Sequence, residues 1–367
     1  MGMMKRFQNE FVAEFVVTEA CNLKCNFCYM SNKNSFMTLD VFKAHLDSLP
    51  EILKEYNCDA YSTSFFGGEP LLNYNLIKEI LPILSKDPKC QAIVMPTNGL
   101  LLDQEKIDRF KAYKVNVSWS FNGLWHHDHD DFPKFKEIRK LLPYNTCKAM
   151  IGPDRKYTLS ENYEWFIKEF NMLSPDFSIV RDNIWCKKEV EKYKNEIKDL
   201  ADNVIIVNKT GKFSLPSPFN LYLLDTIVAK KYGKRAFGCF AGCHGAAFMP
   251  DSRVYPCARY GSEGKLEDVL FTTKPKRRFP VTITRFKDPK NINPCVFDRC
   301  KVCELFTYCN AGCTHSQQSI GFKPIPEVCE IFKATYEQTF RIVEELGSDL
   351  IFRTKIRNFL KEKSLCL

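Results

Sequence analysis

The sequence predicts an α/β fold: a partial (β/α)6 barrel of the TIM type, followed by a small cysteine-rich domain and a C-terminal helix. Short β-rich runs alternate with helical patterns from about residue 11 to about residue 225. Alternation of this kind indicates a parallel sheet covered by helices. After about residue 230 these patterns give way to loops rich in glycine and cysteine, which favours a domain stapled by metal. We place the barrel at 1–228, the cysteine-rich domain at 229–345 and a helical tail at 346–367.

Six strand–helix units follow one another in the first part of the chain. The strand segments are EFVAEFVVT, AYSTSFFGG, AIVMPTNG, VNVSWSFNG, CKAMIGP and FSIVRDNIW. The helical segments that follow them are LDVFKAHLDSLPEILKEY, YNLIKEILPILSK, DQEKIDRFKAY, FPKFKEIRKLL, SENYEWFIKEF and EVEKYKNEIKDLADN. Six units make an incomplete barrel, whose functional loops lie at the C-terminal ends of its strands. The last long helical segment is EVCEIFKATYEQTFRIVEEL.

Composition narrows the class of protein. The 367 residues are 45% hydrophobic, and their longest apolar stretches are too short or too interrupted by charge to span a bilayer. The N-terminus lacks the apolar core of a signal peptide, so we expect a cytoplasmic protein without membrane contact. Thiols stay reduced in that compartment, and the 17 cysteines therefore favour metal binding over disulfides. The net charge of +9 suits a polyanion, but no recognised nucleic-acid motif accompanies it.

Three cysteines crowd the loop after the first predicted strand, in TEACNLKCNFCYM. Cys21, Cys25 and Cys28 can converge on one iron–sulfur cube and leave its fourth iron open for a ligand. A zinc site completed by a distant His or Cys is the alternative on spacing alone. FFGGEP, PTNG and SFNG also fall at strand ends, where the active sites of barrel enzymes are built.

The segment CNLKCNFC resembles the CxxxCxΦC signature of the radical S-adenosylmethionine (SAM) superfamily, with Phe27 at the aromatic position Φ. The family's other features follow in order: GGEP at 67–70, TNG at 97–99, and SFNG at 120–123, which is close to the family's SxDG. Asn122 stands where Asp is commoner. The resemblance implies that SAM binds the open iron and is cleaved to a 5′-deoxyadenosyl radical, which abstracts hydrogen from a substrate carbon.

The resemblance also implies which residues hold SAM. Gly67, Gly68 and Glu69 would meet the methionyl amino group, and Ser120 the ribose or carboxylate. Phe27 and Ile151 would pack near the adenine. The full expected set is Phe27, Gly67, Gly68, Glu69, Pro70, Thr97, Asn98, Ser120, Asn122 and Ile151.

A second cysteine field lies near the C-terminus. Cys300-x2-Cys303-x5-Cys309-x3-Cys313, followed by Cys329, resembles the SPASM domain, which carries two auxiliary 4Fe-4S clusters. The resemblance implies three 4Fe-4S clusters in all. One auxiliary cluster would be held by Cys239, Cys243, Cys257 and Cys313, and the other by Cys300, Cys303, Cys309 and Cys329. A pair of zinc sites is the alternative, and Cys295 is a possible substitute ligand.

Candidate catalytic residues are few, and no general base stands out. They are His127, Asp128, Arg181 and Arg259. The run LWHHDHD around His127 looks like a metal site, but relatives often carry a His-Asp pair here in a loop that caps the active site. Ala258 follows the cysteine of YPC where the sulfatase-maturing branch has Asp, which argues against formylglycine formation.

Enzymes with this two-domain arrangement mostly modify ribosomally made peptides or proteins by thioether or carbon–carbon crosslinking, epimerisation or oxidation. The resemblance therefore implies a radical SAM oxidoreductase with a peptide or protein substrate and an electron donor such as flavodoxin or ferredoxin. About ten residues precede the first predicted strand, so we expect the substrate to be held by a separate leader-binding protein, by the basic segment 274–290, or without a leader at all. For the basic segment a solvated loop is favoured over a docking surface. Modification of a nucleic-acid base or small molecule, and a non-catalytic iron–sulfur electron carrier, are the alternatives.

Overall fold

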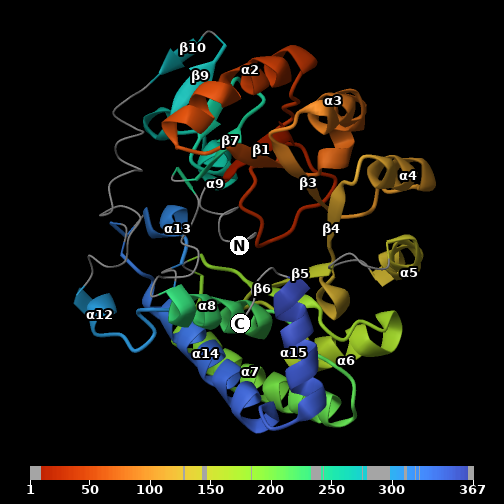
Figure 1. The fold of residues 1–367 in the computed structure, drawn as a ribbon, viewed down its shortest axis with the longest axis vertical. Coiled ribbons are helices and arrows are strands. Elements are labelled where there is room, and N and C mark those ends of the chain that lie inside the picture. Colours follow the sequence, from red (N-terminus) through yellow and green to blue (C-terminus); the bar gives the residue numbers. More distant parts are fainter. Residues whose placement is uncertain are drawn as a thin grey trace.

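The described part of the computed structural model contains one mixed sheet of ten strands. It covers residues 10–126, 129–142, 147–182, 184–232, 241–242, 244–274, 276–278, 298–309, 312–318, 320–321 and 323–362. The strand order is β10-β9-β8-β7-β1-β2-β3-β4-β5-β6. Strands β1 to β6 are neighbours in chain order and pair in parallel. The predicted α/β class with a parallel, partial barrel is thereby confirmed (Figure 1).

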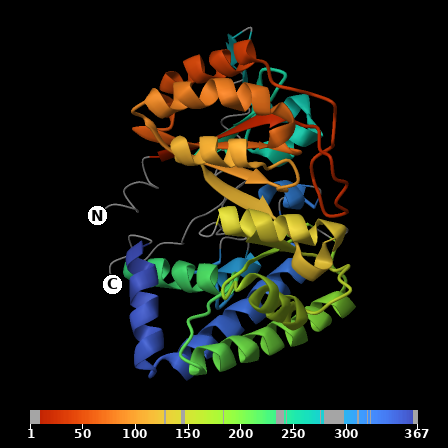
Figure 2. The same cartoon turned by 90° about the vertical axis from the view of Figure 1, so that its right-hand side faces the viewer.

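Each barrel strand leads into a helix on the outer side of the sheet. The strands are β1 (Glu10–Thr18), β2 (Ala60–Gly67), β3 (Cys90–Thr97), β4 (Asn116–Ser120), β5 (Cys147–Ile151) and β6 (Asp176–Ile179). The helices are α2 (Leu39–Glu55), α3 (Tyr74–Lys86), α4 (Gln104–Ala112), α5 (Phe132–Leu141), α6 (Leu159–Phe170) and α7 (Lys187–Lys209). Figure 2 shows α2 to α5 stacked down one face of the molecule, in orange to yellow. Short 3-10 helices are η1 (Pro70–Asn73), η2 (Gly123–Trp125), η3 (His129–Asp131) and η4 (Leu266–Asp268).

Alternation along β1 explains how the first strand is held. Phe11, Ala13 and Phe15 are fully buried, whereas the intervening Glu14 is only partly buried. Phe15 packs against Phe42 of α2, with 4.9 Å between ring centroids. Because side chains alternate across a strand, Glu14 lies on the opposite side, toward the barrel interior.

Local sequence signals set the helix starts. Thr38 caps α2 by accepting the N–H of Val41 at 3.3 Å. Thr158 and Glu161 form a capping box at the start of α6, each side chain bonded to the other's backbone N–H. Such boxes satisfy donors that a helix N-terminus leaves unpaired.

The C-terminal segment extends the barrel sheet. β7 (Gly245–Phe248) pairs in parallel with β1, and β8 (Arg253–Tyr255), β9 (Phe271–Thr273) and β10 (Lys276–Arg278) continue the sheet in antiparallel fashion. His45 of α2 joins this extension through contacts of 2.9 Å with Met249 O and with Thr273 Oγ1. The short helices of the region are α9 (Ala258–Glu263), α12 (Asp298–Lys301) and α13 (Thr314–Gln318).

Long helices close the other end of the molecule. α14 (Pro326–Leu346) runs along α7, where Tyr193 OH lies 2.9 Å from Thr335 Oγ1. α8 (Phe219–Tyr232) packs on α14 through stacked rings of Tyr222 and Tyr336, 4.3 Å apart. The predicted helical tail contains α15 (Leu350–Glu362). The predicted domain boundary at residue 228 falls within α8, and the domain limits stay predictions. None of the helices in the described ranges is long and apolar enough to span a bilayer.

Candidate active site at the ends of the barrel strands

The three clustered cysteines lie on the loop that joins β1 to α2. Cys28 N–H donates to Cys25 O at 3.1 Å, and Cys21 N–H donates to Asn32 Oδ1 at 2.7 Å. Burial and the neighbouring thiols of Cys28 and Cys21 together raise the pKa of the Cys25 thiol to about 11. The three thiols are therefore close enough to influence one another. Cys28 is exposed, and Cys21 and Cys25 are half-buried.

The donor set of this loop suits a cluster better than an ion held by the protein alone. Within the described ranges no three His, Cys, Asp or Glu side chains converge closely enough to hold a metal ion. The loop nevertheless offers three neighbouring thiols at one surface, which is what an iron–sulfur cube with three protein ligands requires. The residues present fit that group, and the ligand roles of Cys21, Cys25 and Cys28 stay predictions.

Two glycines of GGEP pack directly against this loop. Gly68 N–H donates to Thr18 O at 3.0 Å, and Glu69 N–H donates to Ala20 O at 2.8 Å. A Cβ atom on Gly67, whose φ is +144°, would lie 1.8 Å from Thr18 O, and one on Gly68 would lie 2.2 Å from Ala20 O. Only glycine fits such an approach of two backbones. The motif thus fixes the start of the cysteine loop.

The Glu69 carboxylate joins GGEP to the TNG motif. Oε1 accepts from Thr97 Oγ1 at 2.7 Å and from Leu71 N at 3.0 Å, and Oε2 accepts from Asn98 N at 2.7 Å. Burial raises the pKa of Glu69, and these hydrogen bonds lower it. Glu69 therefore positions the ends of β2 and β3 relative to each other. Its expected contact with the methionyl amino group stays a prediction.

Asn22 connects the cysteine loop to the TNG motif, and sequence analysis did not single it out. Asn98 Nδ2 donates to Asn22 Oδ1 at 2.7 Å, which ties the TNG motif to the spacer between Cys21 and Cys25. The only signal in the sequence is that Asn22 lies inside the cysteine motif. The cysteine loop, GGEP and TNG are thus one hydrogen-bonded unit.

Asn122 of SFNG bridges the ends of β4 and β5. Its Oδ1 accepts from Met150 N at 2.9 Å, and its backbone O accepts from Asn162 Nδ2 at 3.0 Å. An Asp at this position would also have an Oδ1 atom. The replacement of Asp by Asn in SxDG therefore keeps the oxygen that accepts from Met150 N. Ser120, at the end of β4, is exposed, and its contact with SAM stays a prediction.

A cavity of about 190 Å³ lies between the cysteine loop and the ends of β4, β5 and β6. Phe27 and Asn122 line it, as do Trp125, Met150, Arg155 and Ile184. Ile151, expected beside the adenine, is fully buried in the hydrophobic core. The flanking Met150 and Gly152 line the cavity instead, because alternate residues of β5 face opposite sides of the sheet.

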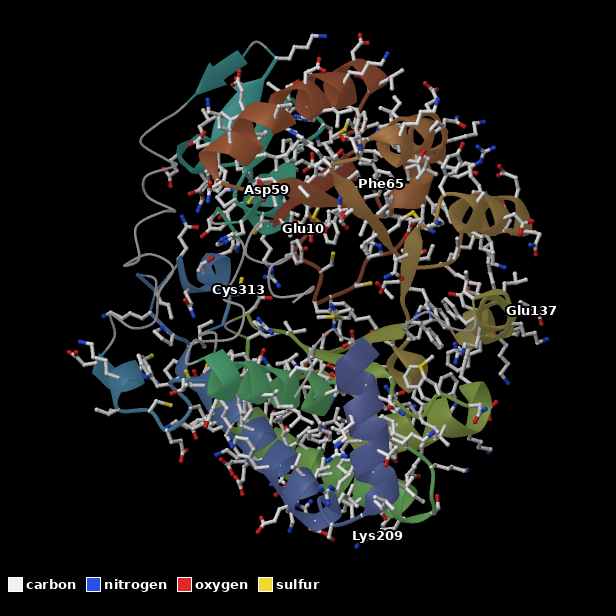
Figure 3. The ribbon with its side chains drawn as sticks, in the orientation of Figure 1. Glu10, Asp59, Phe65, Glu137, Lys209 and Cys313 are labelled. Atoms are coloured by element: carbon white, nitrogen blue, oxygen red, sulfur yellow. The ribbon has the colours of Figure 1, made fainter. Side chains whose placement is uncertain are left out.

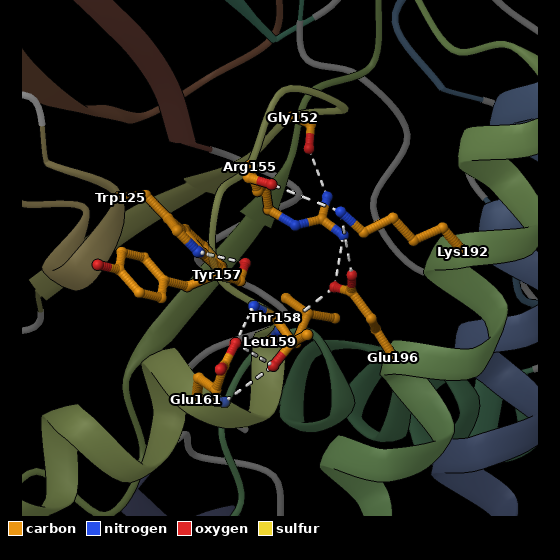
Figure 4. A network of polar contacts seen from close by, with 9 residues as sticks. All are labelled: Trp125, Gly152, Arg155, Tyr157, Thr158, Leu159, Glu161, Lys192 and Glu196. Carbon is orange, nitrogen blue, oxygen red and sulfur yellow. Dashed lines mark hydrogen bonds and ion pairs between the residues drawn. The ribbon is translucent and has the colours of Figure 1, made fainter.

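One wall of the cavity rests on a buried polar network (Figure 4). Arg155 Nη2 donates to Glu196 Oε2 of α7 at 2.6 Å, and Nη1 donates to Gly152 O. The guanidinium lies 5.8 Å from the centre of the Trp125 ring, whose Nε1 donates to Tyr157 O at 2.9 Å. None of these residues except Trp125 belongs to a motif that the sequence made visible.

Two of the four candidate catalytic residues, His127 and Asp128, lie outside the described residues. Arg181 packs over the ring of Phe332 of α14, 5.5 Å from its centre, and its charge opposes the burial that raises the pKa of Asp225 to about 7. Arg181 thus contacts the helical layer. Among the described residues, Arg181 is not one of those that line the cavity.

Arg259 lies where the cysteine loop meets the C-terminal segment. Its Nη1 donates to Asp182 Oδ1 at 2.5 Å, and its guanidinium lies 4.2 Å from the centre of the Tyr29 ring. Ser316 Oγ donates to the same oxygen of Asp182 at 2.6 Å. These contacts hold the residues after Cys257 and Cys313 against the barrel mouth.

Glu14 is a partly buried acid that sequence analysis missed. Burial raises its pKa to about 7, although one carboxylate oxygen accepts from Ala258 N at 3.3 Å. It lies near Tyr29, whose pKa burial and Glu14 both raise. The sequence does contain a signal for it, because Glu14 is a charged residue in the middle of the otherwise largely apolar strand segment EFVAEFVVT.

In the folded chain, some of the cysteines near the C-terminus lie close to one another. Burial raises the pKa of Cys329 to about 11, with smaller contributions from Cys309, Cys300 and Cys303, so these three thiols lie near Cys329. Cys257 and Cys313 both raise the pKa of the Tyr260 hydroxyl, so each of them lies near Tyr260. Figure 3 labels Cys313, which directly precedes α13. Cys239 and Cys243, the other expected ligands of that set, lie outside the described residues.

Comparison with known proteins gives a family match. Residues 15–138 match the model of the radical SAM superfamily. The chain is 23% identical over 284 residues to the antilisterial bacteriocin subtilosin biosynthesis protein AlbA of Bacillus subtilis, covering 70% of this chain and 57% of AlbA. It is 27% identical over 326 residues to the radical SAM cyclopropyl synthase TigE of Paramaledivibacter caminithermalis, covering 82% of this chain and 67% of TigE.

A solved structure has the same fold. Native anSMEcpe with bound AdoMet and Cp18Cys peptide matches with a TM-score of 0.71 at 18% identity, over 91% of this chain and 98% of that chain. The chain spans only about half the length of the first curated relatives it matches, 48% and 57%.

Proposed function

We propose that the chain, whose residues 15–138 match the radical SAM superfamily model, is an oxidoreductase that modifies a ribosomally made peptide or protein with SAM and a 4Fe-4S cluster. The observation that carries this proposal is the hydrogen-bonded unit of the cysteine loop, GGEP and TNG, which gathers three thiols at the C-terminal ends of the barrel strands. When bound, the cluster and SAM supply a carbon radical that abstracts hydrogen from an unactivated substrate carbon.

The chain's own residues have distinct tasks in this proposal. Cys21, Cys25 and Cys28 would hold the cluster, and the cavity lined by Phe27 and Asn122 would take the nucleoside end of SAM. Glu69 orients the GGEP loop through its bonds to Thr97 and Asn98. Backbone groups and amides in this arrangement need little rearrangement when a ligand binds.

Glu14 is the described residue best suited to hold or move a proton. It lies on the interior side of β1, and one of its carboxylate oxygens is anchored by Ala258 N–H. Tyr29 lies beside it, and Arg259 lies over the Tyr29 ring. A carboxyl group whose pKa is near the working pH is an efficient proton acceptor.

We further propose two auxiliary 4Fe-4S clusters in the C-terminal field, for a total of three. The position of Cys300, Cys303 and Cys309 near Cys329 supports the second of them, and the position of Cys257 and Cys313 near Tyr260 supports the first. With four protein ligands each, they would serve electron transfer rather than bind substrate, since open metal positions are what bind substrates. The cysteine-rich domain would then extend over residues 229–345.

The peptide substrate is supported by the relatives. AlbA is named for the biosynthesis of a bacteriocin, and the anSMEcpe structure holds a peptide. An electron donor such as flavodoxin or ferredoxin and a separate leader-binding protein are the partners we propose.

The first test is anaerobic reconstitution followed by iron counting. We expect about twelve irons per chain and 5′-deoxyadenosine on addition of dithionite and SAM. The variant Cys21→Ala/Cys25→Ala/Cys28→Ala should lose about four irons and all cleavage. Cys58→Ala, in the core, should retain both. Bound zinc in place of iron, or no cleavage by the parent protein, would overturn the proposed function.

A further inference from the structure

One wall of the cavity is the loop between β5 and α6. Gly152, Pro153, Asp154 and Arg155 all line the cavity. Arg155 closes the loop on itself, because its guanidinium donates to the carbonyl of Gly152. The shape of this wall therefore depends on where that guanidinium is held.

Glu196 of α7 holds it in place. Its Oε2 accepts from Arg155 Nη2 at 2.6 Å and from Leu159 N at 3.2 Å, and Lys192 Nζ lies 3.6 Å from its Oε1. Arg155 is 8% exposed and Glu196 is 5% exposed. Figure 4 shows Arg155 reaching down from the loop to Glu196 on the helix.

A buried ion pair of this kind contributes little to stability, because desolvation offsets the attraction between the charges. Its clearest effect is to fix the position of the groups it joins. Arg155 also keeps one donor unused: among the described residues Nε has no hydrogen-bond partner. A buried N–H without an acceptor is unfavourable, so the bonds from Nη1 and Nη2 are what hold the guanidinium in this position.

The chemistry of the cavity suits a flat ring without net charge. Trp125 and Phe27 provide aromatic surface, and Asn122 provides an amide. The guanidinium charge is already compensated by Glu196, so the site offers hydrogen bonding without attracting an anion.

We propose that Arg155, held by Glu196, is a positioning residue that sets the affinity of the cavity for the nucleoside end of SAM. It acts through the 152–154 wall and the Trp125 ring. The proposal rests on the proposed function in that the ligand is SAM.

The test uses 5′-deoxyadenosine as the probe on the reconstituted full chain, since this molecule lacks the sulfonium and amino-acid groups that would bind the cluster. Binding is followed by Trp125 fluorescence and by equilibrium dialysis. Arg155→Met and Glu196→Gln should each weaken binding by about tenfold, the effect of losing one well-placed contact. In the double variant the two losses should not add. Arg155→Lys should restore part of the affinity, and Trp125→Phe should remove the fluorescence change.

The kinetic readout separates positioning from loss of fold. We expect the KM for SAM to rise by about tenfold in Glu196→Gln, with substrate-free cleavage at saturating SAM and iron content unchanged. The matched control is Arg341→Met, which breaks another ion pair of α7, that of Arg341 with Asp202 at 2.7 Å. It should leave nucleoside affinity unchanged.

Two outcomes distinguish a failure of the positioning role from a failure of the proposed function. If the parent protein cleaves SAM but Glu196→Gln and Arg155→Met bind 5′-deoxyadenosine as tightly as the parent, the positioning role is wrong and the proposed function stands. If SAM is not cleaved but the probe binds in an Arg155-dependent way, the proposed function fails and the nucleoside site stands.

Discussion

The hydroxyl of Thr97 donates to the carboxylate of Glu69 at 2.7 Å, and both side chains are buried. The same carboxylate accepts the N–H of Asn98, so two strand ends are locked by one acid. Three donors converge on a group that has only acceptor atoms, which makes the charge state and shape of Glu69 structurally decisive.

Replacing this carboxylate by an amide should disrupt the loop. In Glu69→Gln the amide nitrogen replaces one oxygen, so a donor faces the donor of Thr97 or Asn98. A buried unsatisfied donor costs about 1–3 kcal/mol, and we expect a matching loss of unfolding free energy together with at least tenfold slower SAM cleavage. Urea unfolding and 5′-deoxyadenosine assays check this. Glu79→Gln, on the exposed side of α3, should change neither.

The glycine of GGEP that contacts β1 should tolerate no side chain. In Gly67→Ala the new Cβ would lie 1.8 Å from Thr18 O, a clash with backbone that no rotamer relieves. We expect a loss of more than about 3 kcal/mol and no SAM cleavage. Gly211→Ala shares a positive φ, +82°, but meets nothing within 4 Å, and should lose only about 1–2 kcal/mol. Equal losses in the two variants would contradict the close approach.

His45 should make the fold sensitive to acid. Burial lowers its pKa from 6.5 to about 4, partly opposed by its bond to Met249 O. Between pH 6.5 and 4, His45 is therefore protonated in the unfolded chain but neutral in the folded protein. The free energy of unfolding falls as the pH is lowered through that window. Over the full window the effect is at most about 3 kcal/mol. Thermal unfolding from pH 7 to pH 5 should show a shallower decline in His45→Gln than in the parent.

Glu14 should act in the opposite sense. Its pKa rises from 4.5 to about 7 on burial, so the folded protein holds a proton between these values that the unfolded chain has lost. Stability therefore decreases as the pH rises from 4.5 to 7. Glu14→Gln should raise the melting temperature at pH 8, and the difference from the parent should disappear near pH 4.5. Glu164→Gln, on the exposed face of α6, serves as the control and should show no such pH dependence.

Much of the fold could be predicted because the strands and helices follow from local sequence patterns, namely the periodicity of apolar residues and the capping residues. The alternation of Phe11, Ala13 and Phe15 along β1, and the capping box of Thr158 and Glu161, are properties of short segments. The cysteine spacing and GGEP were equally visible, and the radical SAM superfamily that they suggested is the one whose model residues 15–138 match. Their ligand roles stay predictions, as does a cytoplasmic location.

Other features could not be predicted because they join residues distant in sequence. Ile151 was expected at the adenine, but the pleat of β5 turns it into the core and presents Met150 and Gly152 to the cavity. Nothing in the segment around Glu196 indicates that its carboxylate meets Arg155, 41 residues away.

By itself, the sequence determined the parallel barrel, the strand ends that carry the motifs and the thiols that cluster after β1, since period and spacing act over a few residues. Only the tertiary structure decided that Glu69 joins GGEP to TNG, that Arg155 rests on Glu196, and that Glu14 faces the barrel interior beside Ala258. The physical reason is that burial and hydrogen bonding depend on which segments pack together, and the free energy of each buried polar group is set by partners from other elements.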